Sequence, residues 1–239
     1  MSRHDNLILL APLSGPIVKL EDVADPVFSQ KLVGDGIAID PVSTTLLSPC
    51  DGRIVQLHRA HHAITVQTSD GIQVLMHIGL DTVQLKGEGF SPRVKMFDEV
   101  QAGQPLIDFD ADLIARKAKS LVTIIAITEG PAHTLQMTSK SFVEAGRDNV
   151  LTVQLADNQA AVQTSESHQS ITSQLITVTS ESGLHARPAA QLVAIAKKYQ
   201  GKIELLKNKK STNAQSVVSL LALEIAHNDQ VQFTADGPD

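Results

Sequence analysis

Three Asp-Gly pairs, at residues 35–36, 51–52 and 70–71, separate short apolar segments in the first part of the chain. Asp and Gly tolerate the positive φ angles of tight hairpin turns, so each pair favours a reversal between two strands. Many short strands at this spacing are typical of a sandwich or barrel. Residues 7–155 are therefore predicted to be mainly β-structure, with one short helix at 110–120 that an aspartate near its start could cap.

The pattern changes in the segment 156–170, ADNQAAVQTSESHQS. It offers little beyond alanine and one valine for burial, which predicts a flexible linker. Strand-like and helix-like segments alternate after it, which predicts a smaller α+β domain. We therefore expect two domains, 1–155 and 171–239, on either side of the linker. The predicted helices of the second domain are 186–199 and 213–226, and its strands are 173–180, 201–207 and 229–236.

Composition excludes several classes of function. The net charge of −6 argues against a nucleic-acid partner. A single cysteine, Cys50, rules out an internal disulfide framework and a multi-cysteine zinc site, and this residue fits a small side chain entering a strand better than a nucleophile. The apolar run at residues 7–13 is too short to span a membrane. We expect a cytoplasmic protein with no direct membrane insertion.

A candidate anion site lies at SGLHARPAAQL, residues 182–192. Gly183 frees the chain before a predicted helix, and Pro188 fits the first turn, where its missing N–H is not needed. The first-turn amides and the helix dipole would attract an anion near His185, and Arg187 adds a planar donor fork suited to phosphate. An imidazole there could accept a phosphoryl group. The alternative is a helix-capping histidine beside an incidental arginine, which would give the same sequence pattern.

The stretch GLHARPAAQLVAIAKKY resembles the active-site signature of HPr, the histidine phosphocarrier of the bacterial phosphoenolpyruvate-dependent sugar phosphotransferase system. The resemblance spans about 171–239 and includes NKKSTNAQSVVSLLALEI. It implies that His185 is phosphorylated, that Arg187 contacts the phosphoryl group, and that Ser216 matches a serine that a kinase modifies in some members. The alternative for Ser216 is a polar residue in the first turns of a helix.

The HPr resemblance also implies an open-faced sandwich of order βαββαβα. This chain stops after the last strand, so we expect the order βαββαβ with the final helix missing and an apolar face of the sheet exposed. A C-terminally truncated domain of this kind suggests a longer protein, and family architecture suggests that an enzyme I domain, which would use Mg, follows.

A second histidine set lies in RAHHAITVQTSDGIQVLMHIGLDTVQLKGEGF. His62 and His77 stand on either side of the Asp70-Gly71 pair, and on two antiparallel strands they could share one face. Two facing imidazoles could bind a metal, share protons or hold a phosphoryl group. Two unrelated strand histidines are the alternative, and no third ligand for a closed zinc site is evident.

The segments LSGPIVKLEDVADPVFSQKLVGDGIAIDP and MHIGLDTVQLKGEGF are similar to the glucose-type enzyme IIA of the same phosphotransferase system. The similarity covers nearly all of residues 7–155 and implies an all-β sandwich. It implies that His77 is the phosphorylated residue and His62 its neighbour in a shallow active site. Asp25 and Asp81 match flanking acids, which could bond the arginine of the donor carrier or orient the histidines; an Asx turn is the alternative for each.

The resemblance implies further features of the same site. Phe28, Leu32 and Val33 match an apolar docking surface, although core residues would look the same. Ala60 stands where many members have a threonine whose hydroxyl helps the site. In some members the two histidines complete a zinc site with a partner's carboxylate, so zinc is expected on His62 and His77 only in a partner complex. The extra imidazoles, His58 and His61, are interpreted as surface residues.

Together the two resemblances predict a fused phosphoryl relay. Enzyme I would phosphorylate His185, which would pass the group to His77 and then to a sugar-specific IIB domain of a IIB/IIC permease. One alternative is a regulatory binding module whose phosphorylation state controls transporters or metabolic enzymes. Another is a metal-dependent hydrolase that uses His62, His77 and an acid. The sugar is not identified by these residues.

Overall fold

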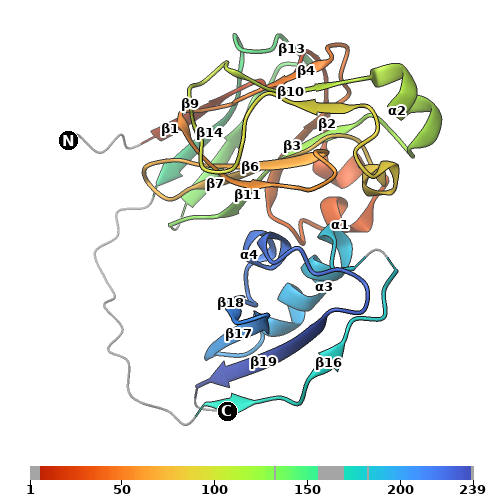
Figure 1. Ribbon diagram of the computed structural model, residues 1–239. Coiled ribbons are helices and arrows are strands. Elements are labelled where there is room, and N and C mark those ends of the chain that lie inside the picture. The colour runs from red at the N-terminus through yellow and green to blue at the C-terminus, as the bar shows by residue number, and fades with distance from the viewer. Residues whose placement is uncertain (1–5, 132, 156–169, 182, 238–239) are drawn as a thin grey trace. The chain divides into compact units, whose positions relative to one another are not determined.

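Figure 1 shows the computed structural model, which describes residues 6–131, 133–155, 170–181 and 183–237. The chain divides into two compact units, residues 1–158 and 159–239. The predicted linker, 156–170, lies outside the described residues except for its last position. The expected fold class is confirmed, because the first unit is mostly β-structure and the second is an α+β open-faced sandwich.

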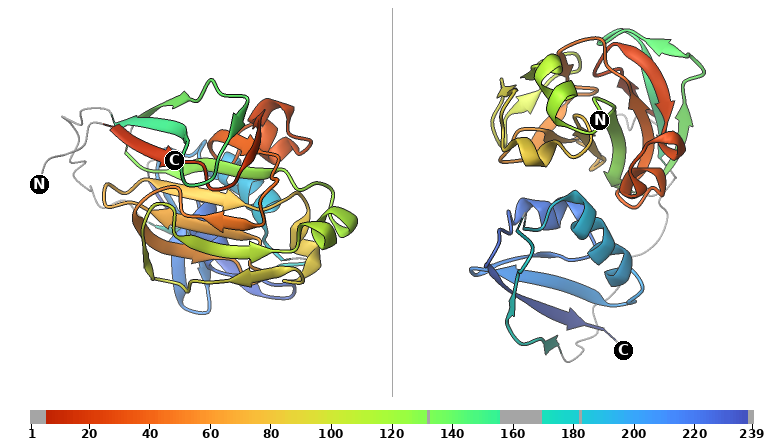
Figure 2. Two further views of the ribbon diagram at one scale, coloured as in Figure 1. Left: turned by 90° about the horizontal axis from the view of Figure 1, so that it is seen from above. Right: turned by 90° about the vertical axis from the view of Figure 1, so that its right-hand side faces the viewer.

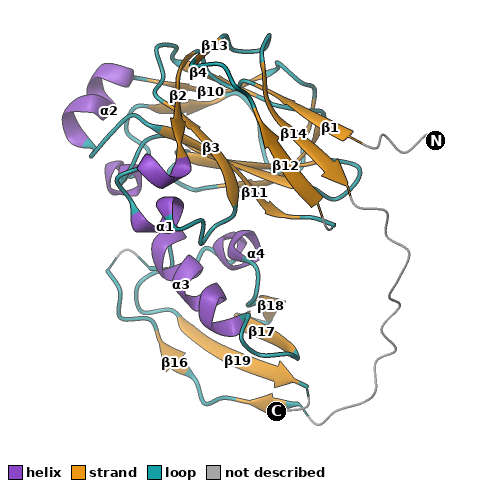
Figure 3. Ribbon diagram, turned by 180° about the vertical axis from the view of Figure 1, so that it is seen from behind, coloured by secondary structure: helices purple, strands orange, loops and turns teal. Residues whose placement is uncertain are grey.

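The first unit is built from antiparallel strands. In its described part, an eight-stranded sheet has the order β13-β2-β3-β11-β7-β6-β5-β9. Two three-stranded sheets have the orders β4-β10-β8 and β1-β14-β12, the second of which is labelled in Figure 3. The strands are β1 (Asn6–Leu10), β2 (Gly15–Lys19), β3 (Asp35–Ile39), β4 (Thr45–Leu47), β5 (Gly52–Leu57), β6 (Ala63–Gln67), β7 (Gln73–His77), β8 (Phe90–Pro92), β9 (Glu99–Val100), β10 (Pro105–Phe109), β11 (Thr123–Glu129), β12 (His133–Met137), β13 (Phe142–Val143) and β14 (Asn149–Leu155).

The three Asp-Gly pairs serve two purposes. Gly71, at φ +84°, lies in the loop between β6 and β7, as a hairpin turn requires. The other two pairs are not hairpin turns, so that prediction was wrong for them. Gly36 and Gly52 stand at the starts of strands, where a Cβ would lie 2.1 Å from the Ile125 carbonyl oxygen and 2.4 Å from that of Gln67. Glycine is needed there because a neighbouring backbone approaches closely.

Short helical segments join the strands of this unit. The predicted helix at 110–120 is confirmed as α2 (Ala111–Lys117), which is drawn in light green in Figure 2. The carboxylate of Asp110 accepts a hydrogen bond from the Leu113 N–H at 2.9 Å. Asp110 is therefore the cap, which satisfies one of the free amides at the helix start. The remaining segments are η1 (Leu20–Asp22), α1 (Pro26–Ser29) and η2 (Thr82–Leu85).

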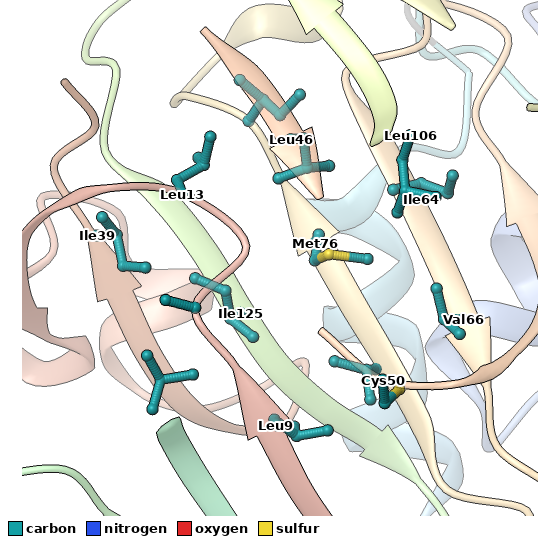
Figure 4. Close-up of a cluster of buried hydrophobic side chains, with 14 of the residues drawn as sticks. Leu9, Leu13, Ile39, Leu46, Cys50, Ile64, Val66, Met76, Leu106 and Ile125 are labelled. Carbon is teal, nitrogen blue, oxygen red and sulfur yellow. The ribbon is translucent and has the colours of Figure 1, made fainter. Parts of the chain in front are cut away.

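The core of the first unit lies between its sheets, where Leu, Ile and Val side chains from opposite strands meet (Figure 4). Cys50 is part of this cluster and is only 3% exposed. Burial raises the pKa of its thiol to about 12, which leaves it protonated and unreactive at neutral pH. The interpretation of Cys50 as a packing residue agrees with this position.

In the described part of the second unit, one sheet has the order β15-β19-β17-β18, and β16 also pairs with β19. Helices α3 and α4 lie on one face of it (Figure 1). The elements are β15 (Ile171–Thr172), β16 (Ile176–Thr177), α3 (Ala186–Ala196), β17 (Lys202–Lys207), β18 (Lys210–Asn213), α4 (Val217–Ala222) and β19 (Gln230–Asp236).

Two predicted elements of this unit differ from the structure. The single strand expected at 173–180 is two short strands, because Ser173 interrupts the ladder: its Oγ accepts the Phe233 N–H at 3.0 Å. Helix α4 is shorter than the expected 213–226. Its start is displaced by β18 and by the Ser216 cap, and its end is set by Glu224, which has a φ of +46°.

Several large apolar side chains of the second unit face solvent. Ile171 and Ile176, on the edge strands, are 67% and 43% exposed, and Ile195 on α3 is 69% exposed. That a whole apolar face of the sheet is exposed stays a prediction. Within the described residues, every helix of the protein falls short of the length and apolar character that crossing a bilayer requires.

Candidate functional site

His77 is the last residue of β7, where the strand pairs with Ala63 on one side and Ile124 on the other. Its Nδ1 atom lies 2.8 Å from the carbonyl oxygen of Gly79. Because a carbonyl oxygen can only accept a hydrogen bond, Nδ1 carries the ring proton. The other nitrogen, Nε2, therefore holds the free electron pair, and it is the atom of this ring that can act as a nucleophile.

His62 lies directly beside His77, as the strand spacing predicted. It immediately precedes β6, and its carbonyl oxygen accepts the Ile78 N–H at 2.8 Å. The two ring centroids are 4.8 Å apart and the rings meet edge to face at 72°. The β6–β7 hairpin thus brings the two imidazoles to one face of the sheet.

Aromatic side chains enclose the pair. The ring of Phe28 lies 5.3 Å from that of His77, and the ring of Phe90 lies 6.4 Å from that of His62. His77 is 6% exposed and His62 is 3% exposed, so both imidazoles are largely buried. The ring of His77 is buried because it packs between Phe28 and His62, and only a small part of it reaches solvent.

The predicted apolar docking surface is largely internal. Phe28 and Val33 are buried, and Leu32 is half-buried. Phe28 and Val33 are therefore core residues in this structure, which was the alternative to a docking surface. Phe28 nevertheless has a direct place in the site, because its ring contacts His77.

The electrostatics of the site keep His77 neutral. The pKa of His77 is lowered to about 4, chiefly by burial and to a smaller extent by the nearby His58, although the Gly79 hydrogen bond and the Asp25 carboxylate act in the opposite direction. At neutral pH the ring is therefore unprotonated at Nε2. This is the form in which a histidine can form a bond to phosphorus.

The two flanking acids occupy different local positions. Asp25 is 4% exposed and caps α1, since its Oδ1 accepts the Val27 N–H at 2.9 Å. This bond to the main chain agrees with the Asx turn that was the alternative interpretation of Asp25. The charge of Asp25 also raises the pKa of His77. Asp81 is half-buried, has a φ of +59° and precedes η2. That either acid bonds a donor's arginine or orients the histidines stays a prediction.

His58 was interpreted as a surface residue, and the structure contradicts this. Its side chain is half-buried and its ring centroid lies 4.3 Å from that of His62. Its Nδ1 accepts the Ala60 N–H at 3.1 Å. The signal in the sequence was the spacing of four within HRAHH, because a tight turn folds the fifth residue back onto the first. His61 in that turn is half-buried, with a φ of +54°.

The fit of this site to a metal ion can be judged from the residues present. His62 and His77 would supply two imidazole ligands, whereas a tetrahedral zinc site needs four. Across the described parts of the chain, no group of three or more His, Cys, Asp or Glu is arranged to hold a metal ion. Zinc binding would therefore require ligands from a partner, and it stays a prediction.

In the second unit, His185 occupies the N-cap position of α3 and is half-buried. The chain reaches it through Gly183, whose φ is +64° and where a Cβ would lie 2.1 Å from the Ile225 carbonyl oxygen. The next residue, Leu184, donates its N–H to that oxygen at 2.8 Å. Arg187 is exposed in the first turn of the same helix. The local fold thus places an imidazole at a helix N-terminus, with an arginine in the first turn of the same helix.

Ser216 lies at the start of the other helix of this unit. It is 3% exposed, and its Oγ accepts the Ser219 N–H at 3.0 Å, so it is the N-cap of α4. This geometry gives the residue a structural role. Its phosphorylation stays a prediction, and a kinase would need the cap to open.

Two family models match the chain. One describes the phosphoenolpyruvate-dependent sugar phosphotransferase system, EIIA 1, over residues 7–132, and the other describes the PTS HPr component phosphorylation site over residues 172–239. Together with the neutral, buried imidazole of the first unit, these matches define a carrier that transfers phosphoryl groups on histidine. The chain belongs to the EIIA 1 family of the sugar phosphotransferase system, and an HPr domain follows its EIIA domain.

Individual relatives agree with this assignment. A glucose-specific EIIA component of Bacillus cereus is 45% identical over 131 residues, which are 55% of this chain and 79% of that protein. One from Staphylococcus aureus is 40% identical over 149 residues, which are 62% of this chain and 90% of that protein. Among solved structures, the glucose permease IIA of Mycoplasma capricolum aligns with a TM-score of 0.61 at 37% identity, covering 64% of this chain and 98% of that one.

Proposed function

We propose that this protein relays phosphoryl groups in the cytoplasm from enzyme I to His185, then to His77, and then to the IIB domain of a IIB/IIC sugar permease. The observation that supports it most is the hydrogen bond between His77 Nδ1 and the Gly79 carbonyl oxygen. That bond fixes the proton on one nitrogen and leaves the electron pair on the other.

The transfer to His77 is a displacement at phosphorus. The electron pair on His77 Nε2 forms a new N–P bond, while the N–P bond of phosphorylated His185 breaks and its electron pair returns to that imidazole. The His77 ring then carries the positive charge of an N-phosphorylated imidazolium. The Gly79 carbonyl oxygen accepts the Nδ1–H that shares this charge, so the bond should strengthen as the product forms.

His62 is the proposed neighbour of the transferred group. Its ring stands edge-on to His77 with centroids 4.8 Å apart, which is close enough for a ring N–H to reach a phosphoryl oxygen on Nε2. Such a bond would be stronger to the charged phosphoryl group than to water. His62 is therefore proposed to hold the group on His77 rather than to form a bond to phosphorus itself.

At the donor histidine, His185, we propose that Arg187 and the N-terminus of α3 hold the phosphoryl group, as His62 does at His77. The guanidinium group is exposed, and the N-terminus of an eleven-residue helix provides backbone N–H groups and the positive end of the helix dipole beside His185. These groups would stabilise the phosphoryl charge while it resides on His185. Because Arg187 is exposed, it could also reach an acid on the receiving surface.

The predicted linker would make the transfer between the two histidines intramolecular. A flexible chain of the length of segment 156–170 has a root-mean-square span of about 20 Å. Tethering over such a distance corresponds to an effective concentration in the millimolar range. The second unit would therefore meet the first far more often than a separate carrier at cellular concentrations.

The test is phosphorylation of the full chain with phosphoenolpyruvate and separately prepared enzyme I, followed by mass spectrometry under alkaline conditions that preserve phosphohistidine. The relay predicts label on both His185 and His77, and loss of label from both in His185→Ala. A matched control, His168→Ala, removes a histidine from the predicted linker and should label normally. Undiminished labelling of His77 in His185→Ala would contradict the proposed order.

A further inference from the structure

We propose that His58 is a positioning residue of the phosphoryl-transfer site: its ring holds the His62 imidazole edge-on against His77. The inference rests on the function proposed above, in which His77 receives the phosphoryl group. Neither the family resemblance nor the sequence pattern assigned His58 a role. It follows from the row of three imidazoles that the fold brings together, with centroid spacings of 4.3 Å and 4.8 Å.

The backbone N–H and carbonyl groups of His58 both form hydrogen bonds. Its N–H donates to the Ala63 carbonyl oxygen at 2.9 Å, and its own carbonyl oxygen accepts the His61 N–H at 2.7 Å. These bonds close the turn between β5 and β6, and the positive φ of His61 reverses the chain. His62 is therefore returned to the same side of the sheet as His58, where the two rings meet.

The ring of His58 is itself fixed. Its Nδ1 accepts the Ala60 N–H at 3.1 Å, so a neutral ring carries its proton on Nε2. Rotation of the ring would break this bond, and Ala60 is buried, so water could replace it only with difficulty. His58 therefore presents a rigid face to His62 rather than a mobile side chain.

His62 in turn has little freedom. Its ring lies between His58 and His77, and Phe90 borders it at 6.4 Å. Removing the His58 ring would open space on one side and allow the His62 imidazole to turn away from His77. Because transfer depends on alignment, a small displacement of His62 should slow the reaction without abolishing it.

The same geometry has a simpler explanation, in which His58 only caps its turn through the Ala60 N–H. Two variants separate the explanations. His58→Asn keeps an oxygen that can accept the Ala60 N–H but removes the ring, whereas His58→Phe keeps a ring against His62 but cannot accept the bond. Ring positioning predicts that Asn is the more harmful replacement, and turn capping predicts that Phe is.

The measurement is the single-turnover rate at which label reaches His77 in the full chain, with label on His185 as an internal reference. We expect His58→Asn to lower this rate about 10-fold and His58→Phe to stay within about 3-fold of the unchanged protein. The ¹⁵N resonances of the His62 ring should shift in His58→Asn and return in His58→Phe. The control His61→Asn changes the adjacent imidazole, at a positive φ that Asn tolerates, and should keep the original rate.

The outcomes are distinct. If His77 takes no label in the unchanged protein, the proposed relay fails, whatever the variants do. If His77 is labelled and His58→Asn transfers at the original rate with unshifted His62 resonances, the positioning role is overturned. A slower rate in His58→Phe than in His58→Asn overturns it in favour of turn capping. Urea midpoints of both variants show whether either change in rate reflects unfolding.

Discussion

The Nδ1 atom of His77 donates a hydrogen bond to the carbonyl oxygen of Gly79, two residues later, at 2.8 Å. The bond is possible because Gly79 has a φ of +69°, which turns its carbonyl group back toward the imidazole. One glycine conformation therefore selects which nitrogen of the ring is free to react. The chemistry of the site depends on a backbone feature as much as on the histidine.

Gly79→Ala should damage both stability and transfer. A Cβ at this position would lie 2.7 Å from the Ser120 carbonyl oxygen and 2.7 Å from a methyl group of Thr82, in addition to the unfavourable φ. The expected loss is about 2–3 kcal/mol in the free energy of unfolding, with slower labelling of His77. Urea unfolding followed by circular dichroism, and the labelling rate, measure the two effects.

A matched control for this variant is Gly103→Ala. Gly103 has a similar φ of +80°, but a Cβ there would meet nothing within 4 Å. The free energy of unfolding of Gly103→Ala should therefore fall by only about 1 kcal/mol, because alanine is unfavourable at a positive φ. The labelling rate of His77 should stay unchanged. Equal losses in the two variants would show that crowding at Gly79 is unimportant.

The protonation of His77 should make the first unit less stable in acid. Burial lowers its pKa from 6.5 to about 4 in the folded protein, so between these values the unfolded chain binds more protons than the folded one. Stability from this group is thus complete above pH 6.5 and falls as the pH decreases toward 4. Relative to pH 7, the loss at pH 4.5 is about 2–3 kcal/mol.

The variant His77→Gln isolates this contribution. Glutamine does not titrate, so the difference in unfolding free energy between pH 7 and pH 4.5 should be about 2–3 kcal/mol smaller than in the unchanged protein. Urea unfolding at the two pH values measures it. An identical pH dependence in both proteins would mean that His77 keeps an ordinary pKa when folded.

Gln215 should be a major stabilising residue of the second unit. Its Nε2 lies 3.1 Å from the Ala196 carbonyl oxygen and 3.2 Å from those of Tyr199 and Gly201, at the end of α3. Gln215→Glu replaces this donor with an acceptor of the same shape, so about 1–3 kcal/mol should be lost. Tyr199 is the one tyrosine of a chain without tryptophan, so its fluorescence reports unfolding of this unit. Gln230→Glu, at an exposed position, is the control and should change little.

Ser216 allows a test of the cap on α4. Ser216→Ala removes the acceptor for the Ser219 N–H and should cost about 1 kcal/mol. Ser216→Asp keeps an acceptor and places a negative charge at the helix start, so it should remain close to the unchanged stability. Unfolding followed by Tyr199 fluorescence distinguishes them. If Asp proves as destabilising as Ala, the cap is not what Ser216 contributes.

Local patterns predicted much of the fold because short-range physics determines them. The cap at Asp110, the hairpin at Asp70-Gly71 and the alternation after residue 171 each depend on neighbouring residues. The predictions failed where a distant strand intervened. Gly36 and Gly52 looked like turn residues, but they are glycines because the carbonyl groups of Ile125 and Gln67 approach them.

The sequence by itself determined the family, the two histidines that are candidates for phosphorylation, and the hairpin that pairs His62 with His77. Only the tertiary structure decided that His77 is buried against Phe28, that its Nδ1 proton is held by Gly79, and that His58 contacts His62. The reason is physical: strand spacing places residues on a face, whereas burial, tautomer and ring contact depend on which groups other elements bring to that face.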